Sequence, residues 1–374
     1  MGAGHVGKVI LKIVFRCDAS LQIGTGHVMR CLTLADALTK QGAECHFICR
    51  DHIGNLIEKI RQSGFEVYKI GSEKNVNLKS NILPNEQNQL FHSGWLCTTQ
   101  QQDAQDCLPI LEELQTDWLV VDHYALDKTW QQALKSYYKK LLVIDDLGDR
   151  EHLADLLLDQ NYGSTVEKYQ SLVPESCKVL AGSNYALLRP EFALWREYSL
   201  NRRKNSASIS SILITLGGAD PDNYTLKILQ QLAGVELHPH IEIIVVMGST
   251  APHLKSVQHQ AADMLVKTMV EVNVNNMAEL MSNADLAIGA AGATTWERCC
   301  LGLPTIQLVI AENQRQIAEY LAKDSAIKLL GNINELGYLI ASTEKWLSTT
   351  AIRSMLVADG LGAKRVAEYL IKGL

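Results

Sequence analysis

Short apolar runs alternate with amphipathic stretches along most of this 374-residue chain, and no other feature constrains its fold as strongly. Apolar runs of about four to eight residues are typical of strands buried on both faces, and helical periodicity between them is typical of βαβ units. The alternation occurs on both sides of a polar, basic stretch at residues 199–211. We therefore predict an α/β protein with two Rossmann-like parallel-sheet domains in tandem.

The polar stretch lacks apolar periodicity and is typical of an interdomain linker. We expect one domain over residues 8–200, a second over 208–351, and a C-terminal helix over 352–374. The predicted strands are Val9–Phe15, Glu44–Cys49, Trp118–Asp122, Leu141–Asp145, Ile212–Leu216, Glu242–Met247, Leu286–Gly289 and Thr305–Val309. Helical periodicity is clearest over His27–Lys40, Asn55–Gln62 and Asn223–Gln231, and in the final helix, which has a break at Gly360–Gly362. The Gln- and Asn-rich residues 75–106 indicate a polar loop followed by a helix.

Composition narrows the class of protein further. Hydrophobic residues make up 47% of the chain, which excludes a disordered or collagen-like protein. With 35 basic and 41 acidic residues the net charge is −6, so we expect no nucleic-acid partner. No apolar run approaches the roughly 18 residues of a membrane span. The nine cysteines contain no CxxC pair and indicate reduced structural thiols, so we expect a cytoplasmic protein. We also expect the protein to be a monomer.

The first glycine-rich motif, at residues 2–7, matches GxGxxG but has no strand before it, so we discard it as a phosphate site. The loop after the first predicted strand is a better candidate. It contains Arg16, Asp18, Gly24 and Gly26 and leads into a helix. A strand, a glycine turn and a helix start together direct backbone N–H groups at an anion. We take these four residues as candidate substrate-binding residues.

His27 stands at the start of that helix, with Arg30 and Cys31 one turn further on. An imidazole is the side chain that is both neutral and basic near pH 7, and the positive helix end favours its neutral form. His27 is therefore a candidate general base. Spacing alone leaves open that it caps the helix or packs in the core.

Two further predicted strands end in polar residues, Asp122-His-Tyr124 and Asp145-Asp146. Ligands bind beyond the carboxyl ends of strands in doubly wound sheets, so these residues should face the same crevice as His27. The alternative is that Asp122 and Asp145 only cap turns. No additional ligand cluster supports a metal at Asp145 and Asp146, and we predict neither a metal site nor a cofactor.

The second domain has two comparable turns, each between a strand and a helix. Their small residues would let a diphosphate approach the backbone, the hydroxyl groups add donors, and Glu297 could accept hydrogen bonds from ribose hydroxyls. The alternative is a tight turn with an ordinary surface glutamate. The candidate substrate-binding residues here are Gly217, Gly218, Gly292, Ala293, Thr294, Thr295, Glu297 and Gln314.

Taken in order, several segments resemble a known family. They are RCDASLQIGTGHVMRCLTLADAL from Arg16, VVDHY, IDDL, YALLRPEF, GGADPDN, GATTWE, ENQ and DGLGAKRV, which ends at Val366. Together they are similar to the UDP-sugar hydrolases of pseudaminic acid biosynthesis, the PseG family, which share a fold with MurG-type GT-B glycosyltransferases. The histidine-bearing first segment is the most specific.

The resemblance implies a GT-B arrangement with an interdomain cleft, and a C-terminal helix that crosses back to the first domain. It implies a hydrolase that removes UDP from UDP-2,4-diacetamido-2,4,6-trideoxy-β-L-altropyranose. Because UDP is a good leaving group whose charge helix N-termini can hold, we expect no need for a metal, and attack of water from the opposite face predicts inversion. His27 would be the general base, and Asn313 and Tyr124 would position sugar or water. UDP would lie on the second domain, with Glu297 at the ribose and residues 289–295 at the diphosphate.

Other activities would use the same UDP site. The alternatives are a GT-B glycosyltransferase, a UDP-sugar 2-epimerase, a hydrolase of a related UDP-diacetamido sugar, and a non-enzymatic UDP-sugar-binding regulator. A transferase would consume substrate only when its acceptor is present. Fold similarity alone does not decide among these chemistries.

Overall fold

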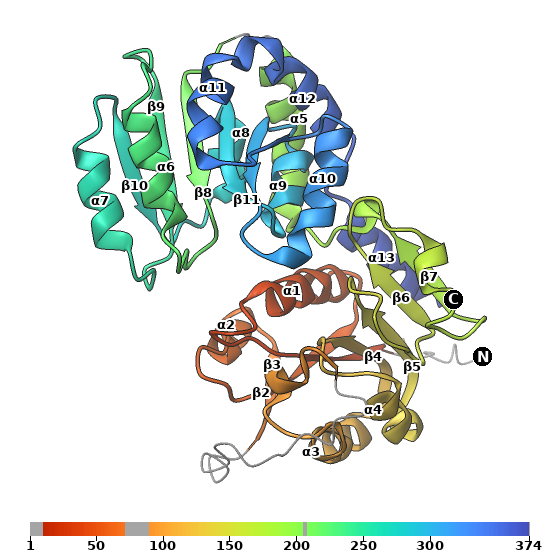
Figure 1. The fold of residues 1–374 in the computed structure, drawn as a ribbon. Coiled ribbons are helices and arrows are strands. Elements are labelled where there is room, and N and C mark those ends of the chain that lie inside the picture. Colours follow the sequence, from red (N-terminus) through yellow and green to blue (C-terminus); the bar gives the residue numbers. More distant parts are fainter. Residues whose placement is uncertain (1–9, 72–89, 205–207, 374) are drawn as a thin grey trace, which may run out of the picture. The chain divides into compact units, whose positions relative to one another are not determined.

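The computed structural model describes residues 10–71, 90–204 and 208–373, and the motif at residues 2–7 lies outside them. The chain divides into two compact units. Unit 1 comprises residues 1–187 and 363–374, and unit 2 comprises residues 188–362. Each unit is a parallel sheet with helices, so the predicted α/β fold with two Rossmann-like domains is confirmed (Figure 1).

Unit 1 holds a seven-stranded parallel sheet in the order β3-β2-β1-β4-β5-β6-β7. Its strands are β1 (Lys12–Cys17), β2 (Glu44–Arg50), β3 (Glu66–Ile70), β4 (Thr116–Asp122), β5 (Tyr138–Ile144), β6 (Leu156–Asp159) and β7 (Lys178–Ala181). Its helices are α1 (Gly26–Thr39), α2 (Ile57–Gln62), α3 (Gln100–Leu114), α4 (Lys128–Ala133) and α13 (Gly362–Lys372), with short 3₁₀ turns η2 (Ser93–Leu96), η3 (Lys135–Tyr137), η4 (Val166–Tyr169) and η5 (Ser183–Tyr185).

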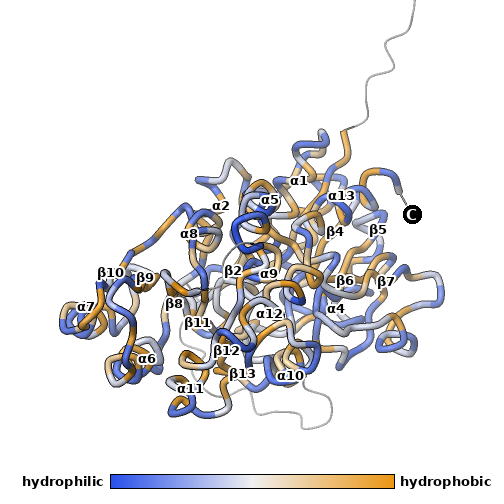
Figure 2. The backbone as a smooth tube through the Cα atoms, turned by 90° about the horizontal axis from the view of Figure 1, so that it is seen from above, coloured by the Kyte–Doolittle hydropathy of each residue, from blue (hydrophilic) through white to orange (hydrophobic). Residues whose placement is uncertain are grey.

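Side chains on β1 alternate between two apolar layers. Ile13 and Phe15 face a layer shared with α1, α2 and α13, whereas Val14 faces a layer shared with α3 and α4. Figure 1 shows the same arrangement, with α1 on one side of the sheet and α3 and α4 on the other. Burial on both faces explains why the central strands are rich in consecutive apolar residues. In Figure 2, where hydrophobic residues are orange, β6 and the neighbouring edge strand β7 are largely orange.

Helix α13 belongs to unit 1 although it ends the chain. Its buried residues Val366, Ala367 and Leu370 pack in the layer that also contains Ile13 and Phe15. The helix therefore completes the core of the first unit rather than that of the second.

Unit 2 repeats the design with six parallel strands in the order β10-β9-β8-β11-β12-β13. They are β8 (Ser211–Thr215), β9 (Glu242–Met247), β10 (Thr268–Val272), β11 (Leu286–Ala290), β12 (Thr305–Leu308) and β13 (Lys328–Leu329). The helices are α5 (Pro190–Lys204), α6 (Tyr224–Ala233), α7 (Leu254–Ala262), α8 (Met277–Asn283), α9 (Thr294–Cys300), α10 (Arg315–Lys323), α11 (Leu336–Ala341) and α12 (Leu347–Ser354), with 3₁₀ turns η6 (Glu312–Gln314), η7 (Ile333–Glu335) and η8 (Thr343–Lys345).

Helix α5 differs from the prediction, because it occupies much of the stretch interpreted as a linker. Its Arg196 Nη2 donates to the Met355 carbonyl at 2.7 Å, and its Arg203 Nη2 donates to the Met281 carbonyl at 2.8 Å. These carbonyls lie at the ends of α12 and α8, where backbone acceptors lack helical partners. Arg203, within the stretch, and Arg196, just before it, therefore fix α5 to unit 2, and the boundary between the units falls at residues 187 and 188 rather than after residue 200.

All nine cysteines lie within the described residues, none forms a disulfide, and seven are buried. Among the helices that the structure describes, none has the length and apolar character needed to cross a membrane.

Candidate active site

The candidate residues of both units lie where the strand order reverses. In unit 1 this point is between β1 and β4, and in unit 2 it is between β8 and β11, each pair being parallel neighbours. Connections on either side of such a point run in opposite directions and leave a crevice at the carboxyl ends of the strands. His27 follows β1 and Asp122 ends β4, so unit 1 brings them to its switch point.

The loop before His27 is shaped by a turn at Ser20. Its hydroxyl accepts a hydrogen bond from the Ile23 amide at 2.9 Å, and its carbonyl accepts one from the Gly24 amide at 2.9 Å. Gly24 has a φ of 80°, a conformation that favours glycine. Added Cβ atoms at Gly24 or Gly26 would meet nothing within 4 Å, so the start of α1 is open.

His27 lies almost entirely below the surface, with 9% of its side chain exposed. Its Nδ1 lies 2.5 Å from Oδ1 of Asp122, which is fully buried. Among the described residues, the contacts of the ring nitrogens with polar groups all involve Nδ1. The sequence left Asp122 open as a turn cap, and the structure instead makes it the partner of the candidate base.

Arg30 binds the same carboxylate from one turn further along α1. Its Nε donates to Oδ2 of Asp122 at 2.6 Å and its Nη2 donates to Oδ1 at 2.7 Å. Burial opposes the charged form of Asp122, but Arg30 and His27 outweigh it and hold the pKa of this carboxyl far below its usual value. Asp122 is therefore a carboxylate throughout the neutral range.

Asp146, from the end of β5, completes the arrangement. Its Oδ2 accepts a hydrogen bond from Arg30 Nη1 at 3.0 Å, and its Oδ1 accepts one from the Tyr124 hydroxyl at 2.5 Å. Burial, with Asp146 adding to it, raises the pKa of Tyr124 well above its usual value, so the phenol stays neutral. Its proton is directed at Asp146, which leaves the lone pairs of the phenol oxygen to accept.

Aromatic rings line the same region. The Tyr124 ring meets the His27 ring edge-on at 4.7 Å between centroids, and Trp95 stacks on Tyr124 at 5.5 Å. His92 packs against Trp95 at 4.3 Å, and both are half-buried. These aromatic rings therefore pack against His27 and against one another.

Two predicted substrate-binding residues lie elsewhere. Arg16 and Asp18 are fully buried and bound to each other at 2.6 Å, and Arg16 also donates to Asp103 of α3 at 2.7 Å through Nη2. The reason is the alternation along β1, which directs Arg16 toward α3 while its neighbours face α1. The interpretation of both residues as direct substrate contacts is therefore wrong, because neither has an exposed atom to offer.

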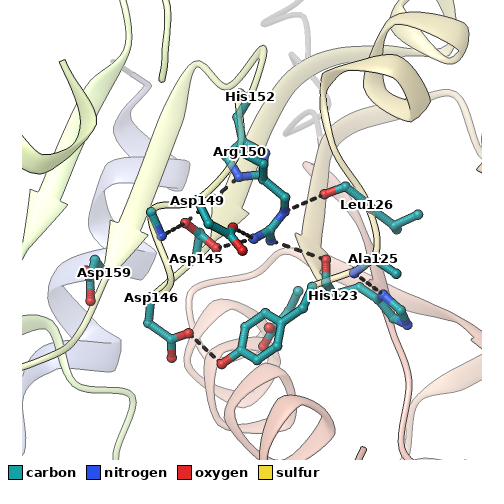
Figure 3. Close-up of polar contacts among 12 residues, drawn as sticks. His123, Ala125, Leu126, Asp145, Asp146, Asp149, Arg150, His152 and Asp159 are labelled. Carbon is teal, nitrogen blue, oxygen red and sulfur yellow. Dashed lines mark hydrogen bonds and ion pairs between the residues drawn. The ribbon is translucent and has the colours of Figure 1, made fainter. Parts of the chain in front are cut away.

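Asp145 is also structural. One oxygen lies 2.9 Å from Arg150 Nη1 and the other accepts from the Gly148 amide at 2.9 Å. Arg150 in turn donates through Nε to the Leu126 carbonyl at 3.0 Å, so it ties the loop after β5 to the loop after β4 (Figure 3). Adjacent acidic residues thus have separate tasks, since Asp145 fixes the loops and Asp146 pairs with Arg30.

In unit 2 the turn after β8 carries Gly217 and Gly218. Gly217 has a φ of 93°, and added Cβ atoms at either glycine would meet nothing within 4 Å. Asp220 accepts hydrogen bonds from the Tyr224 and Thr225 amides at 2.9 and 2.8 Å, so it satisfies donors at the start of α6. The turn is open at its glycines and fixed at its far end.

Hydrogen bonds from the Arg298 side chain hold the turn after β11 in place. This buried guanidinium donates to the Ala290 carbonyl at 2.8 Å and to the Thr294 and Thr295 hydroxyls at 3.0 and 3.2 Å. An added Cβ at Gly292 would meet only the Gln314 amide nitrogen, at 3.9 Å. Both hydroxyl oxygens accept from Arg298, but the buried Thr295 hydroxyl already donates to Gln307 Oε1 at 3.2 Å, so Thr294 is the one of these two residues that can donate to a ligand.

Glu297 lies in the first turns of α9 with 15% of its side chain exposed. Burial raises its pKa, and Arg189, whose Nη2 is 3.5 Å from Oε1, opposes the shift. A desolvated carboxylate with one long contact retains the capacity to accept further hydrogen bonds. Ala293 is the residue before α9, and Asn313 and Gln314 lie in η6 after β12; the side chain of Asn313 is outside the described part of the chain.

Sequence reasoning placed Asp122 and Tyr124 in the same crevice as His27 but missed its other neighbours. Arg30 was noted only for its position, and His92 and Trp95 were not singled out. Their ring contacts and ion pairs join segments about 65 to 120 residues apart, and no local spacing signals that. The described residues contain no group of three or more His, Cys, Asp or Glu side chains placed to hold a metal ion.

Comparisons with known proteins place the chain in a family. The UDP-2,4-diacetamido-2,4,6-trideoxy-β-L-altropyranose hydrolase of Campylobacter jejuni is 28% identical over 84% of this chain and 97% of its own. The spore coat polysaccharide biosynthesis protein SpsG of Bacillus subtilis is 30% identical over 62% of this chain and 69% of its own. The chain belongs to this PseG and SpsG family.

Other matches agree with that placement. Residues 211–346 of this chain match the glycosyltransferase family 28 C-terminal domain. An uncharacterised protein of Methanocaldococcus jannaschii is 28% identical over 88% of the chain, which spans 62% of that relative's length. The crystal structure of Acinetobacter baumannii MurG matches 97% of the chain and all of its own, with a TM-score of 0.69 at 17% identity. The predicted MurG-like fold of this chain is thereby confirmed.

Proposed function

We propose that this PseG-family protein hydrolyses UDP-2,4-diacetamido-2,4,6-trideoxy-β-L-altropyranose to UDP and the free sugar, a step in pseudaminic acid biosynthesis. The observation that carries the proposal is the pair formed by His27 and Asp122, with Nδ1 and Oδ1 2.5 Å apart at the unit 1 switch point. The similarity to the Campylobacter hydrolase over 84% of the chain supports the substrate class.

The reaction needs a base, and His27 supplies it. The imidazole takes a proton from a water molecule while the water oxygen forms a bond to the anomeric carbon. The bond between that carbon and the phosphate oxygen breaks, and its electron pair leaves with UDP. Attack from the face opposite the leaving group gives inversion. A positioned base of this kind contributes about 10²- to 10⁴-fold.

Tyr124 and Asn313 are the proposed positioning residues. Because the Tyr124 hydroxyl donates to Asp146 at 2.5 Å, its oxygen can accept a hydrogen bond from the attacking water or from a sugar hydroxyl. Asn313, in η6, would offer an amide to the sugar or the water. The rings of Trp95 and His92 offer apolar surface to the methyl groups of an acetamido sugar.

Unit 2 would hold the UDP. The open glycines Gly217, Gly218 and Gly292 let a diphosphate approach the backbone, and the Thr294 hydroxyl has a proton to donate. Glu297 would accept from the ribose hydroxyls. UDP is a good leaving group, and preorganised donors of this kind stabilise the charge that develops on it. At the start of α1, added Cβ atoms at Gly24 and Gly26 would meet nothing within 4 Å, so an anion could approach the backbone there.

The proposal is tested by incubating the protein with this UDP-sugar, without metal or acceptor, and following the products by proton NMR. Release of UDP with the inverted anomer appearing first supports it, as does loss of both signals in His27→Gln. If UDP binds but nothing is released until a sugar acceptor is added, the protein is a transferase. Conversion to a second UDP-sugar without release of UDP would indicate an epimerase.

A further inference from the structure

Three charged side chains near His27, those of Arg30, Asp122 and Asp146, are bound to one another and form what we call the charge set. Asp122 and Asp146 each bear one negative charge and Arg30 bears one positive charge, and all three are joined by bonds of 2.6 to 3.0 Å. Arg30 uses Nε, Nη1 and Nη2 in these bonds, with 11% of its side chain exposed. Charges held this far from water interact far more strongly than charges on the surface. The protonation of His27 must therefore depend on this set.

The proton between His27 and Asp122 has a definite place. A contact of 2.5 Å between Nδ1 and Oδ1 requires one proton between the two atoms. Asp122 cannot keep it, because the fork of Arg30 donates to both of its oxygens. The Arg30 Nη2, 3.4 Å from Nδ1, can only donate and so cannot take it either. The proton therefore resides on Nδ1, and the lone pair lies on Nε2.

The charge count also favours the reaction. With His27 neutral, the carboxylates of Asp122 and Asp146 and the guanidinium of Arg30 sum to a net charge of −1. When His27 takes a proton from water, the set becomes neutral. Asp146 thus supplies the negative charge that the imidazolium compensates, although it makes its own contacts with Arg30 and Tyr124 rather than with His27.

We propose that Asp122, Arg30 and Asp146 are positioning residues that together set the tautomer and the basicity of His27. Asp122 holds the proton on Nδ1, Arg30 prevents Asp122 from taking that proton, and Asp146 offsets the charge of Arg30. The role in catalysis rests on the proposed hydrolase function, whereas the tautomer does not. The titratable and charged groups that face this set are Arg30, Cys31, His92, Asp122, Tyr124, Asp146, Asp149 and Arg150.

The tautomer is tested first, on the full chain without substrate. Protein labelled with nitrogen-15 at histidine gives one pair of ring signals per residue, and the pair lost in His27→Gln belongs to His27. The proposal expects a protonated Nδ1 and an unprotonated Nε2 at pH 8. In Asp122→Asn, whose amide can donate to the ring, the assignment should reverse. A protonated Nε2 in the unmodified protein overturns the proposal whatever the protein hydrolyses.

The charge balance is tested by the pH dependence of turnover. In Arg30→Gln the set has a net charge of −2, which favours the protonated imidazole, so the acid limb of the profile should move to higher pH. In Asp146→Asn the net charge is zero, and the limb moves down. Asn at 146 still offers an oxygen to the Tyr124 hydroxyl. Two opposite shifts cannot come from loosened packing, and shifts in the same direction refute the charge balance.

Matched controls remove the same charges elsewhere in unit 1. Arg61→Gln breaks an exposed pair with Glu58 on α2, and Asp36→Asn breaks an exposed pair with Lys40 on α1. Both should leave the acid limb where it is. Arg30→Lys keeps the charge but loses the fork, so it should lower kcat with less movement of the limb than Arg30→Gln. Asp122→Asn should lower kcat by about 10³- to 10⁴-fold with little change in KM.

Discussion

Substitution of Asp103 tests the conclusion that Arg16 stabilises the fold of unit 1 rather than binding the substrate. Its carboxylate accepts from Arg16 Nε at 3.1 Å, Arg16 Nη2 at 2.7 Å, Arg50 Nη2 at 2.7 Å and Trp130 Nε1 at 2.9 Å. It is fully buried. Burial disfavours its charged form, but Arg16 outweighs this and keeps the pKa of Asp103 below its usual value. Asp103→Ala therefore removes a carboxylate on which two arginines and an indole converge.

The expected loss follows from what each partner keeps. Removing one member of a buried ion pair costs about 3–5 kcal/mol. Arg16 retains its 2.6 Å bond to Asp18, and Arg50 retains its 3.0 Å bond to Asp106, so the loss should lie near the lower end, about 3 kcal/mol. For a unit of about 200 residues, this corresponds to a fall in Tm of about 6–12 °C.

Urea denaturation followed by tryptophan fluorescence measures this loss, since Trp130 itself reports on the network. Asp103→Asn, which keeps one acceptor oxygen, should lose less. Neither variant should raise KM for the UDP-sugar in protein that remains folded. A loss of stability below about 1 kcal/mol, together with a raised KM, would refute the reasoning and return Arg16 and Asp18 to the binding site.

Two other predictions concern a glycine pair and a buried histidine. Gly292→Val should lower the affinity for UDP at least about tenfold in calorimetric titration. Its Tm should stay unchanged, because the added Cβ meets only the Gln314 amide nitrogen at 3.9 Å. Gly289→Ala should instead lower Tm, because its Cβ would lie 2.5 Å from Arg298 Nη1. Equal effects of the two changes on Tm would contradict this. Burial lowers the pKa of His152 to about 3, so the unfolded chain binds the extra proton and stability falls as pH drops from about 6.5 toward 3, by up to about 1.4 kcal/mol per pH unit. His152→Gln should flatten that slope in denaturant titrations at several pH values.

Local sequence signals predicted the central strands well. Glu242–Met247 matches β9 at both ends, and β2 and β11 differ from their predictions by one residue. These strands are buried on both faces, so their apolar runs have clear limits. The same signal failed for β3 (Glu66–Ile70) and β10 (Thr268–Val272), which are edge strands with a half-exposed pattern.

The candidate site was predictable where it depends on local order. His27 and the glycine turns follow strands directly, and the strand–turn–helix pattern identifies them. The role of Arg16 could not be predicted, because it depends on the face of β1 that meets α3, 87 residues away in sequence. Arg30 was equally hidden, since its bonds to Asp122 and Asp146 span 92 and 116 residues. Ion pairs between residues far apart in the sequence produce no local pattern of residue types from which they could be predicted.

Hydrolysis in water enriched in oxygen-18 tests the central claim most directly. The account predicts that the label enters the sugar at the anomeric carbon and that UDP stays unlabelled, because His27 directs water at carbon. His27→Gln, with Tm unchanged, should release UDP about 10²- to 10⁴-fold more slowly. Label in the phosphate of UDP, or an undiminished rate in His27→Gln, would contradict the account.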